Sequence, residues 1–116
     1  MINKLVFSRI DEETLKGISR GKPIIKDTFN DYKKVVVKKP WGYEYLIFEN
    51  KYVAVWILYL KNSDLTSMHC HPSKKTSLVV LQGKVVCSSL TNKFELLVGD
   101  GLLIDKGAFH QTKSVS

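Results

Sequence analysis

Short apolar runs separated by turn-forming residues make up the chain from about residue 35 onward. The runs are rich in Val, Ile, Leu, Tyr and Phe, which favour strands, while Gly, Asn, Asp, Ser and Pro gather in the breaks. This pattern predicts strands at residues 35–39, 43–49, 52–61, 66–71, 76–82, 84–90, 93–98, 101–104 and 108–115. Many short strands at such close spacing predict an all-β sandwich or barrel.

One run, Tyr52 to Leu60, is apolar almost throughout instead of alternating with polar residues. A strand of this kind is usually covered on both faces, so we expect the barrel interior on one side and another layer or subunit on the other. We therefore expect a homodimer. The run is too short to cross a bilayer as a helix, and we expect no membrane partner.

The segment before residue 35 has a different texture. Asp11 to Ile18 carries acidic residues in its first turn and apolar residues three positions apart, and Arg20 to Pro23 follows as a stop signal. These features predict one short helix. We expect an N-terminal extension with this helix at residues 1–34 and the barrel at residues 35–116. The N-terminus lacks the apolar core and cleavage site of a signal peptide, so we expect a cytoplasmic protein.

The composition suits a single globular domain, with 116 residues of which 44% are hydrophobic and 25% charged. The net charge is +7, and residues 1–40 hold ten Lys and Arg against five Asp and Glu. Because these charges are interspersed with acids and lack an accompanying aromatic series, we expect no nucleic-acid partner. A small anionic ligand also suits a basic protein. Cys70 and Cys87 are too few for a disulfide framework, and we expect free, buried thiols.

The candidate chemistry lies in the three histidines of the chain, His69, His71 and His110. On a strand, His69 and His71 leave from the same face while Cys70 points the other way. Two imidazoles on one face can hold a metal or work as an acid/base pair. His110 begins a later strand after a turn, and it can join the pair only if the sheet closes on itself.

The residues around these histidines resemble the two motifs of the cupin family. The first motif runs Gly, five residues, His-x-His, three or four residues, Glu, six residues, Gly; the second runs Gly, five residues, Pro-x-Gly, two residues, His, three residues, Asn. This chain keeps both spacings over roughly residues 40 to 116, at Ser63, His69, His71, Thr76 and Gly83 and at Gly99, Asp105, Gly107, His110 and Ser114. The resemblance implies a jelly-roll β-barrel with a divalent metal held inside it.

Within the cupins, the run Lys39 to Glu44 (KPWGYE) resembles the start of the C-terminal cupin domain of type II mannose-6-phosphate isomerases. That resemblance implies a metal-dependent isomerase of sugar-phosphate or nucleotide-sugar metabolism. Lys74 and Lys75 follow the His-x-His pair and are candidates to bind a substrate phosphate. The general base of such an isomerase is not identified by the sequence, so the catalytic residues remain unknown.

Two departures from the cupin pattern affect the expected chemistry. Thr76 stands where the family has a metal-binding Glu, and a neutral hydroxyl is a poor ligand for a hard divalent ion. His69, His71 and His110 remain as metal ligands, a set that suits a transition metal such as Zn²⁺, Ni²⁺ or Fe²⁺. The chain also ends six residues after His110, before the last strands of a cupin barrel. Either the N-terminal segment or a partner supplies these strands, or the sequence is truncated.

Three alternatives to a metal-dependent isomerase stay open. A non-catalytic sugar-binding or regulatory module would keep the barrel after loss of the Glu. Some cupin epimerases and ketoisomerases acting on deoxythymidine-diphosphate sugars use histidines as metal-free acid/base catalysts. Thiol dioxygenases, another cupin branch, use a three-His iron site. The same barrel hosts many chemistries, so the fold alone does not choose among them.

Overall fold

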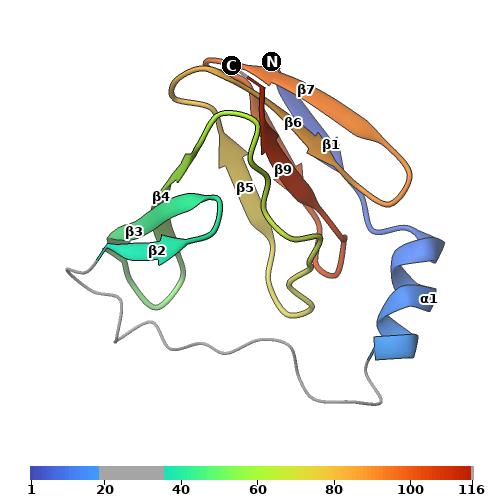
Figure 1. Cartoon of the computed structure of the whole chain (residues 1–116). Helices are drawn as coiled ribbons and strands as arrows, with labels where there is room; N and C mark the ends of the chain where they lie inside the picture. The colour runs from blue at the N-terminus through green and yellow to red at the C-terminus, as the bar shows by residue number, and fades with distance from the viewer. Residues whose placement is uncertain (19–35, 116) are drawn as a thin grey trace.

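The computed structural model describes residues 1–18 and 36–115. In that part of the chain, strands dominate and one short helix lies near the N-terminus (Figure 1). The elements are β1 (Ile2–Leu5), α1 (Arg9–Ile18), β2 (Val37–Lys39), β3 (Gly42–Glu49), β4 (Ala54–Leu60), β5 (Thr76–Val79), β6 (Lys84–Ser88), β7 (Lys93–Leu97), β8 (Gly101–Ile104) and β9 (Gln111–Ser114). The predicted all-β fold with a short N-terminal helix is confirmed.

A reciprocal cap starts helix α1. Ser8 Oγ accepts a hydrogen bond from the Asp11 backbone N–H at 3.2 Å, and Asp11 Oδ2 accepts one from the Ser8 backbone N–H at 2.9 Å. These bonds satisfy two donors that a helix N-terminus otherwise leaves without partners. The helix therefore begins at Arg9, two residues before the predicted start. The predicted stop signal lies outside the described residues. No helix in the described part of the chain is long and apolar enough to span a bilayer.

The strands form three sheets of three strands each, in the orders β1-β8-β5, β7-β6-β9 and β2-β3-β4. All strand pairs are antiparallel except β1 and β8, which are parallel. The first two sheets supply the main core, which consists of Leu5, Val80, Cys87, Leu96, Leu102, Ile104 and Ala108. Burial of each large side chain in this set contributes about 2 kcal/mol.

Strand β1 was not predicted. It pairs with β8 from Ile2 opposite Gly101 to Leu5 opposite Ile104, and the Leu5 side chain enters the core. Its sequence, INKL, is too short and too weakly apolar to signal a strand on its own. The start of the expected N-terminal extension is thus built into the β1-β8-β5 sheet.

The predicted strand at residues 66–71 is wrong. In its place the chain makes two isolated antiparallel bridges, between Leu65 and Lys113 and between His69 and His110. Between these bridges the Ser67 carbonyl accepts a hydrogen bond from a histidine ring instead of a strand neighbour. A continuous ladder is therefore not formed, and the antiparallel register shifts by one residue between the two bridges.

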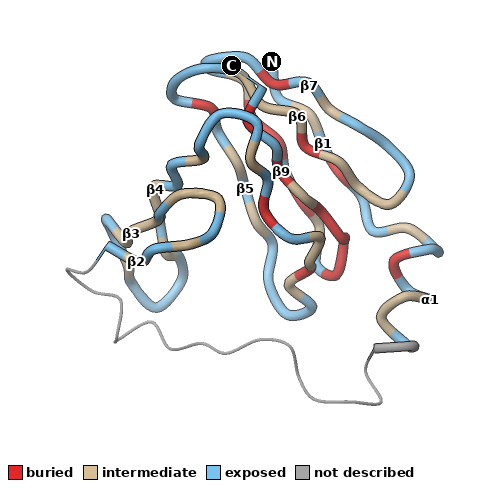
Figure 2. Tube along the Cα trace, viewed as in Figure 1, coloured by how far each residue is buried: buried red, intermediate tan, exposed pale blue. Residues whose placement is uncertain are grey.

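The β2-β3-β4 sheet lies to one side of the other strands (Figure 1), and none of residues 36–61 is buried (Figure 2). In β4, Val55, Leu58 and Tyr59 are 40%, 41% and 51% exposed. The expectation that Tyr52 to Leu60 is covered on both faces is therefore not met by the described residues of one chain. The apolar pattern correctly marked a strand here, but a pattern does not show which chain covers it.

Candidate metal centre

His69 and His110 face each other across the bridge that joins two distant parts of the chain. The His69 backbone N–H donates to the His110 carbonyl at 3.0 Å, and the His110 N–H donates to the His69 carbonyl at 2.8 Å. Directly paired residues of an antiparallel bridge project their side chains to the same face. The bridge therefore brings the two imidazoles together, with ring centroids 4.4 Å apart.

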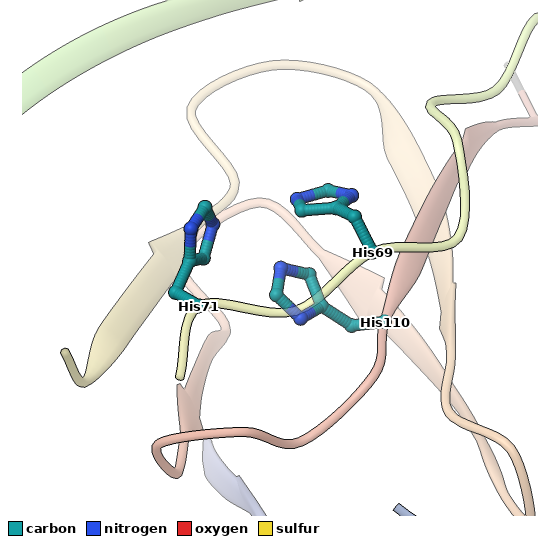
Figure 3. A group of neighbouring side chains, drawn as sticks. All are labelled: His69, His71 and His110. Carbon is teal, nitrogen blue, oxygen red and sulfur yellow. The ribbon is translucent and has the colours of Figure 1, made fainter. Parts of the chain in front are cut away.

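His71 completes the group and comes from the same chain segment as His69, whereas His110 comes from another segment (Figure 3). Its ring centroid lies 5.1 Å from that of His69 and 5.5 Å from that of His110. One ligand nitrogen from each residue can be chosen so that all three lie within 4.8 Å of one another. Among the described residues this is the one His, Cys, Asp or Glu group with such spacing, and it contains no carboxylate. The three predicted ligand residues are thus brought together.

Two of the three rings are oriented by backbone carbonyls. His69 Nδ1 lies 2.7 Å from the Ser67 carbonyl oxygen, and His110 Nδ1 lies 3.0 Å from the Ala108 carbonyl oxygen. A carbonyl can only accept, so Nδ1 is the donor in both rings, and in the neutral imidazole Nε2 then keeps its lone pair. Metal-binding histidines commonly have this arrangement, because the second hydrogen bond fixes both the tautomer and the ring.

His110 is buried, while His69 and His71 are half-buried. Burial lowers the pKa of His110, and the nearby His69 lowers it further, whereas the Ala108 hydrogen bond and the Asp11 charge act in the opposite direction. The net lowering favours the neutral imidazole. A neutral ring is the form that can bind a metal.

The turn at residues 105–107 adjoins the three-His group through a backbone contact with His71. Gly107 has φ +75° and donates its N–H to the His71 carbonyl at 3.0 Å. A Cβ on Gly107 would lie 2.7 Å from Phe7 Cε1 and 3.2 Å from Leu15 Cδ1. Glycine is therefore required both by the left-handed backbone and by the N-terminal segment packed against it.

Asp105, which stands where the second cupin motif has Pro, ties this turn to the N-terminal segment. Its carboxylate accepts from the Phe7 N–H at 3.1 Å, and its own N–H donates to the Leu5 carbonyl at 3.0 Å. Proline has no N–H and no carboxylate, so it could make neither bond. This departure from the motif therefore has a structural role in the present chain.

Ser63 and Ser114 mark two further motif departures, and they contact each other. The Ser63 N–H donates to the Ser114 carbonyl at 3.0 Å. Ser63 has φ +70° and is the one non-glycine residue in the described ranges with a positive φ. The first motif has Gly at this position, so the backbone keeps a glycine conformation after the side chain has changed.

Asp11 is a buried residue beside the centre that sequence reasoning assigned only to a helix. Its side chain is 1% exposed, and Oδ1 accepts from the Phe109 backbone N–H at 2.8 Å. The pattern Ser8-x-x-Asp11 could have identified a helix cap, since it is a capping-box spacing. The contact with Phe109, 98 residues away, has no sequence signal.

Thr76, Lys74 and Lys75 follow His71 along the chain. Thr76 starts β5 opposite Ile104. Lys74 donates its backbone N–H to the His71 carbonyl at 3.5 Å, and both lysine residues are exposed. Their backbone therefore adjoins the centre, while substrate contact by their side chains remains a prediction.

Cys70 and Cys87 are buried and free of disulfide bonds, as predicted. Cys87 lies in the core, where burial raises the pKa of its thiol. Burial, followed by the charge of Asp11, also raises the pKa of Cys70. Both thiols are therefore held in their neutral form, and neither belongs to the three-His group.

No protein-family model matches the chain, and no curated protein matches it. Among solved structures, the chain is similar to a cupin-2 domain containing protein from Shewanella frigidimarina. The two share 16% sequence identity over 80% of this chain and 85% of that chain, with a TM-score of 0.47. A likeness of this size says nothing about ligand or activity. The all-β fold and the three-His group of the present chain fit a cupin-domain protein.

Proposed function

We propose that this is a cupin-domain protein of sugar-phosphate or nucleotide-sugar metabolism whose His69, His71 and His110 hold a divalent transition metal. The main observation behind the metal proposal is that all three histidines, which come from two separate motifs of the sequence, lie together. The Nδ1 hydrogen bonds of His69 and His110 support it, because they leave both Nε2 atoms available.

The donor set favours particular metals. Three neutral imidazoles suit Zn²⁺, Ni²⁺ or Fe²⁺, whereas Mg²⁺ and Mn²⁺ prefer oxygen ligands. The described group contains no carboxylate. We therefore propose a three-His site with open positions for water or substrate. A metal held there supplies Lewis acidity toward the oxygen atoms of a bound sugar.

In this proposal Lys74 and Lys75 recognise the substrate. They follow His71 by three and four residues and carry exposed charges suited to a phosphate. The proposed reaction is a sugar isomerisation, supported by the resemblance of the run Lys39 to Glu44. The absence of a carboxylate from the three-His group favours a second candidate, a sugar-binding module without turnover. An assay for turnover of a sugar phosphate distinguishes the isomerase from the binding module.

Elemental analysis of untagged protein tests the metal site. We expect near-stoichiometric Zn, Ni or Fe in the wild type and none in His69→Ala, while Lys106→Ala, an exposed change in the adjacent turn, should keep the metal. Iron would direct the substrate search to oxygen-consuming reactions, and zinc or nickel to isomerases. Wild-type protein that stays empty after reconstitution would contradict the metal site and leave a metal-free epimerase or a binding module.

Calorimetry with a panel of hexose phosphates tests the ligand class. Loss of a charge-assisted contact to phosphate weakens binding about tenfold or more. We expect that weakening in Lys74→Ala/Lys75→Ala, with little change for the unphosphorylated sugars. Lys51→Ala/Lys93→Ala, which also removes two exposed lysine charges, serves as the charge-matched control. Equal affinity in the wild type and the double variant would contradict the role of these lysines.

We also propose that the protein is a homodimer in the cytoplasm. The exposed apolar residues of β4 mark where a second copy would pack, with β4 as an edge of the β2-β3-β4 sheet. Light scattering of the full chain should give twice the monomer mass. Leu58→Asp should halve that mass, whereas Ser77→Asp, also at an exposed strand position, should not.

A further inference from the structure

We propose that Asp11 is a positioning residue of the three-His centre, acting on His110 through the peptide group between Ala108 and Phe109. The functional meaning of this inference rests on the proposed metal site. The hydrogen bonds from which it is argued are present in the protein without metal. It gives part of the N-terminal segment a role beyond covering the barrel.

A continuous hydrogen-bond chain links the two side chains. Asp11 Oδ1 accepts from the Phe109 N–H at 2.8 Å. The carbonyl of that same peptide group belongs to Ala108, and it accepts from His110 Nδ1 at 3.0 Å. Hydrogen bonds arranged in series polarise one another. The Asp11 carboxylate therefore makes the Ala108 carbonyl a stronger acceptor, which holds the His110 proton on Nδ1 and leaves Nε2 as the ligand atom.

Helix capping accounts for only one oxygen of Asp11. Oδ2 accepts from the Ser8 N–H at 2.9 Å and from Ser8 Oγ at 2.8 Å, which completes the cap of α1. A cap could be made by an exposed residue at the protein surface. Asp11 is instead almost fully buried, with Oδ1 directed at the segment that carries His110. Burial of a carboxylate is costly unless its oxygens are hydrogen-bonded, and here both oxygens are.

The arrangement extends a known pattern by one peptide group. In many metal sites a carboxylate accepts directly from the second nitrogen of a ligating histidine, and loss of such a partner lowers metal affinity by about 10- to 100-fold. Here the carboxylate reaches the ring through a peptide. We therefore expect an effect near the lower end of that range, about tenfold.

Three variants separate positioning from capping. Asp11→Ala removes both functions, and Asp11→Asn replaces the carboxylate by a weaker neutral acceptor. Ser8→Ala removes the hydroxyl part of the cap and leaves the Phe109 bond in place. Three measurements apply to each variant: Phe109 amide hydrogen exchange, the His110 tautomer from long-range ¹H–¹⁵N spectra, and Co²⁺ affinity by absorption titration. The first two use the metal-free full-length protein.

In Asp11→Ala we expect Phe109 exchange to accelerate at least tenfold, His110 to lose its single Nδ1–H tautomer, and Co²⁺ affinity to fall about tenfold. Asp11→Asn should show the same changes at smaller size. Ser8→Ala should match the wild type at Phe109 and His110. The Leu96 amide, in the core strand β7, should remain protected in every variant and report that the fold is intact.

A folded Asp11→Ala protein with wild-type Phe109 exchange and His110 tautomer would overturn the inference, whether or not the protein binds metal. Ser8→Ala changes equal to those of Asp11→Ala would also overturn it, by reducing Asp11 to a helix cap. If Asp11→Ala does not fold, Asp11→Asn provides the test. Phe109 exchange and a His110 tautomer equal to those of the wild type in Asp11→Asn would then overturn the inference. A wild type that binds no Co²⁺ while its tautomer depends on Asp11 would instead overturn the metal function alone.

Discussion

The two halves of this molecule use their apolar residues differently. The β1-β8-β5 and β7-β6-β9 sheets contribute nearly all of the main core, and that core includes Leu96 and Leu102 at 0% exposure. The β2-β3-β4 sheet is rich in Leu, Ile, Tyr, Phe and Trp, yet none of its residues is buried (Figure 2). Apolar composition therefore marks strands in both halves, but it marks a core in only one of them.

The candidate metal centre belongs with the buried half. His110 precedes β9, which pairs with β6. The segment before His110 is bonded to Leu5 of β1 through the Asp105 N–H and to Asp11 of α1 through the Phe109 N–H. The centre thus rests on elements whose mutual packing fixes side-chain positions. In the β2-β3-β4 sheet, Tyr43 and Tyr59 stack with ring centroids 5.0 Å apart, beside a hollow of about 270 Å³ that none of the histidines lines.

The largest expected effect distinguishes the two halves by leucine truncation. Leu96→Ala removes a fully buried side chain and should lower the free energy of unfolding by about 3 kcal/mol. Leu58 is 41% exposed in the single chain, so Leu58→Ala should cost less than about 1.5 kcal/mol at protein concentrations low enough to dissociate the proposed dimer. Urea denaturation monitored by far-ultraviolet circular dichroism measures both. A Leu58→Ala cost equal to that of Leu96→Ala at that dilution would contradict the exposure of Leu58 in the single chain.

Next in size is the effect of a methyl group in the turn that adjoins the centre. Gly107→Ala combines a left-handed backbone with an overlap against Phe7, and should cost about 2 to 3 kcal/mol. Gly99→Ala is the matched control, since its φ is also positive but nothing lies within 4 Å of the added carbon. It should cost about 1 kcal/mol. Equal costs for the two variants, by the same denaturation assay, would show that the contact with Phe7 does not form in solution.

A smaller effect comes from the buried thiol of Cys87. Burial raises its pKa in the folded protein, so the unfolded thiol ionises at lower pH than the folded one. The unfolded state then binds fewer protons, and stability falls as pH rises above the ordinary thiol pKa of about 8.5. The free energy of unfolding should therefore fall as the pH rises from 7.5 to 9.5. Cys87→Ala should be less stable at neutral pH, but its free energy of unfolding should lack the part of the pH dependence that the thiol contributes. A slope unchanged by the substitution would contradict the buried position.

The sequence was most informative where spacing carries the constraint. His69, His71 and His110 were predicted as a group because the two motifs fix their distances along the chain, and the structure brings them together. The free cysteines and the α1 helix followed from composition and local pattern. These features depend on neighbours within a few residues, or on a spacing that the fold class already implies.

Features that depend on distant partners could not be predicted. The role of Asp11 rests on a bond to a residue 98 positions away, and β1 is stabilised by pairing with β8 instead of by its own residues. The exposure of Leu58 depends on which surfaces meet β4, which its apolar pattern does not specify. Local patterns determine the type of an element, whereas its partners are determined by the packing of the whole chain.

The smallest expected effect lies at Ser63, where the chain leaves the β2-β3-β4 sheet and enters the buried half. A left-handed φ of +70° costs a serine about 1 kcal/mol or more, and glycine relieves that cost while adding about 0.5 to 1 kcal/mol of unfolded-state entropy. Ser63→Gly should therefore raise the free energy of unfolding by about 0.5 kcal/mol. Ser77→Gly, in β5 without a positive φ, should lower it by a similar amount. Destabilisation by both substitutions would show that Ser63 has a negative φ in solution, and that the motif glycine conformation is not kept at this junction.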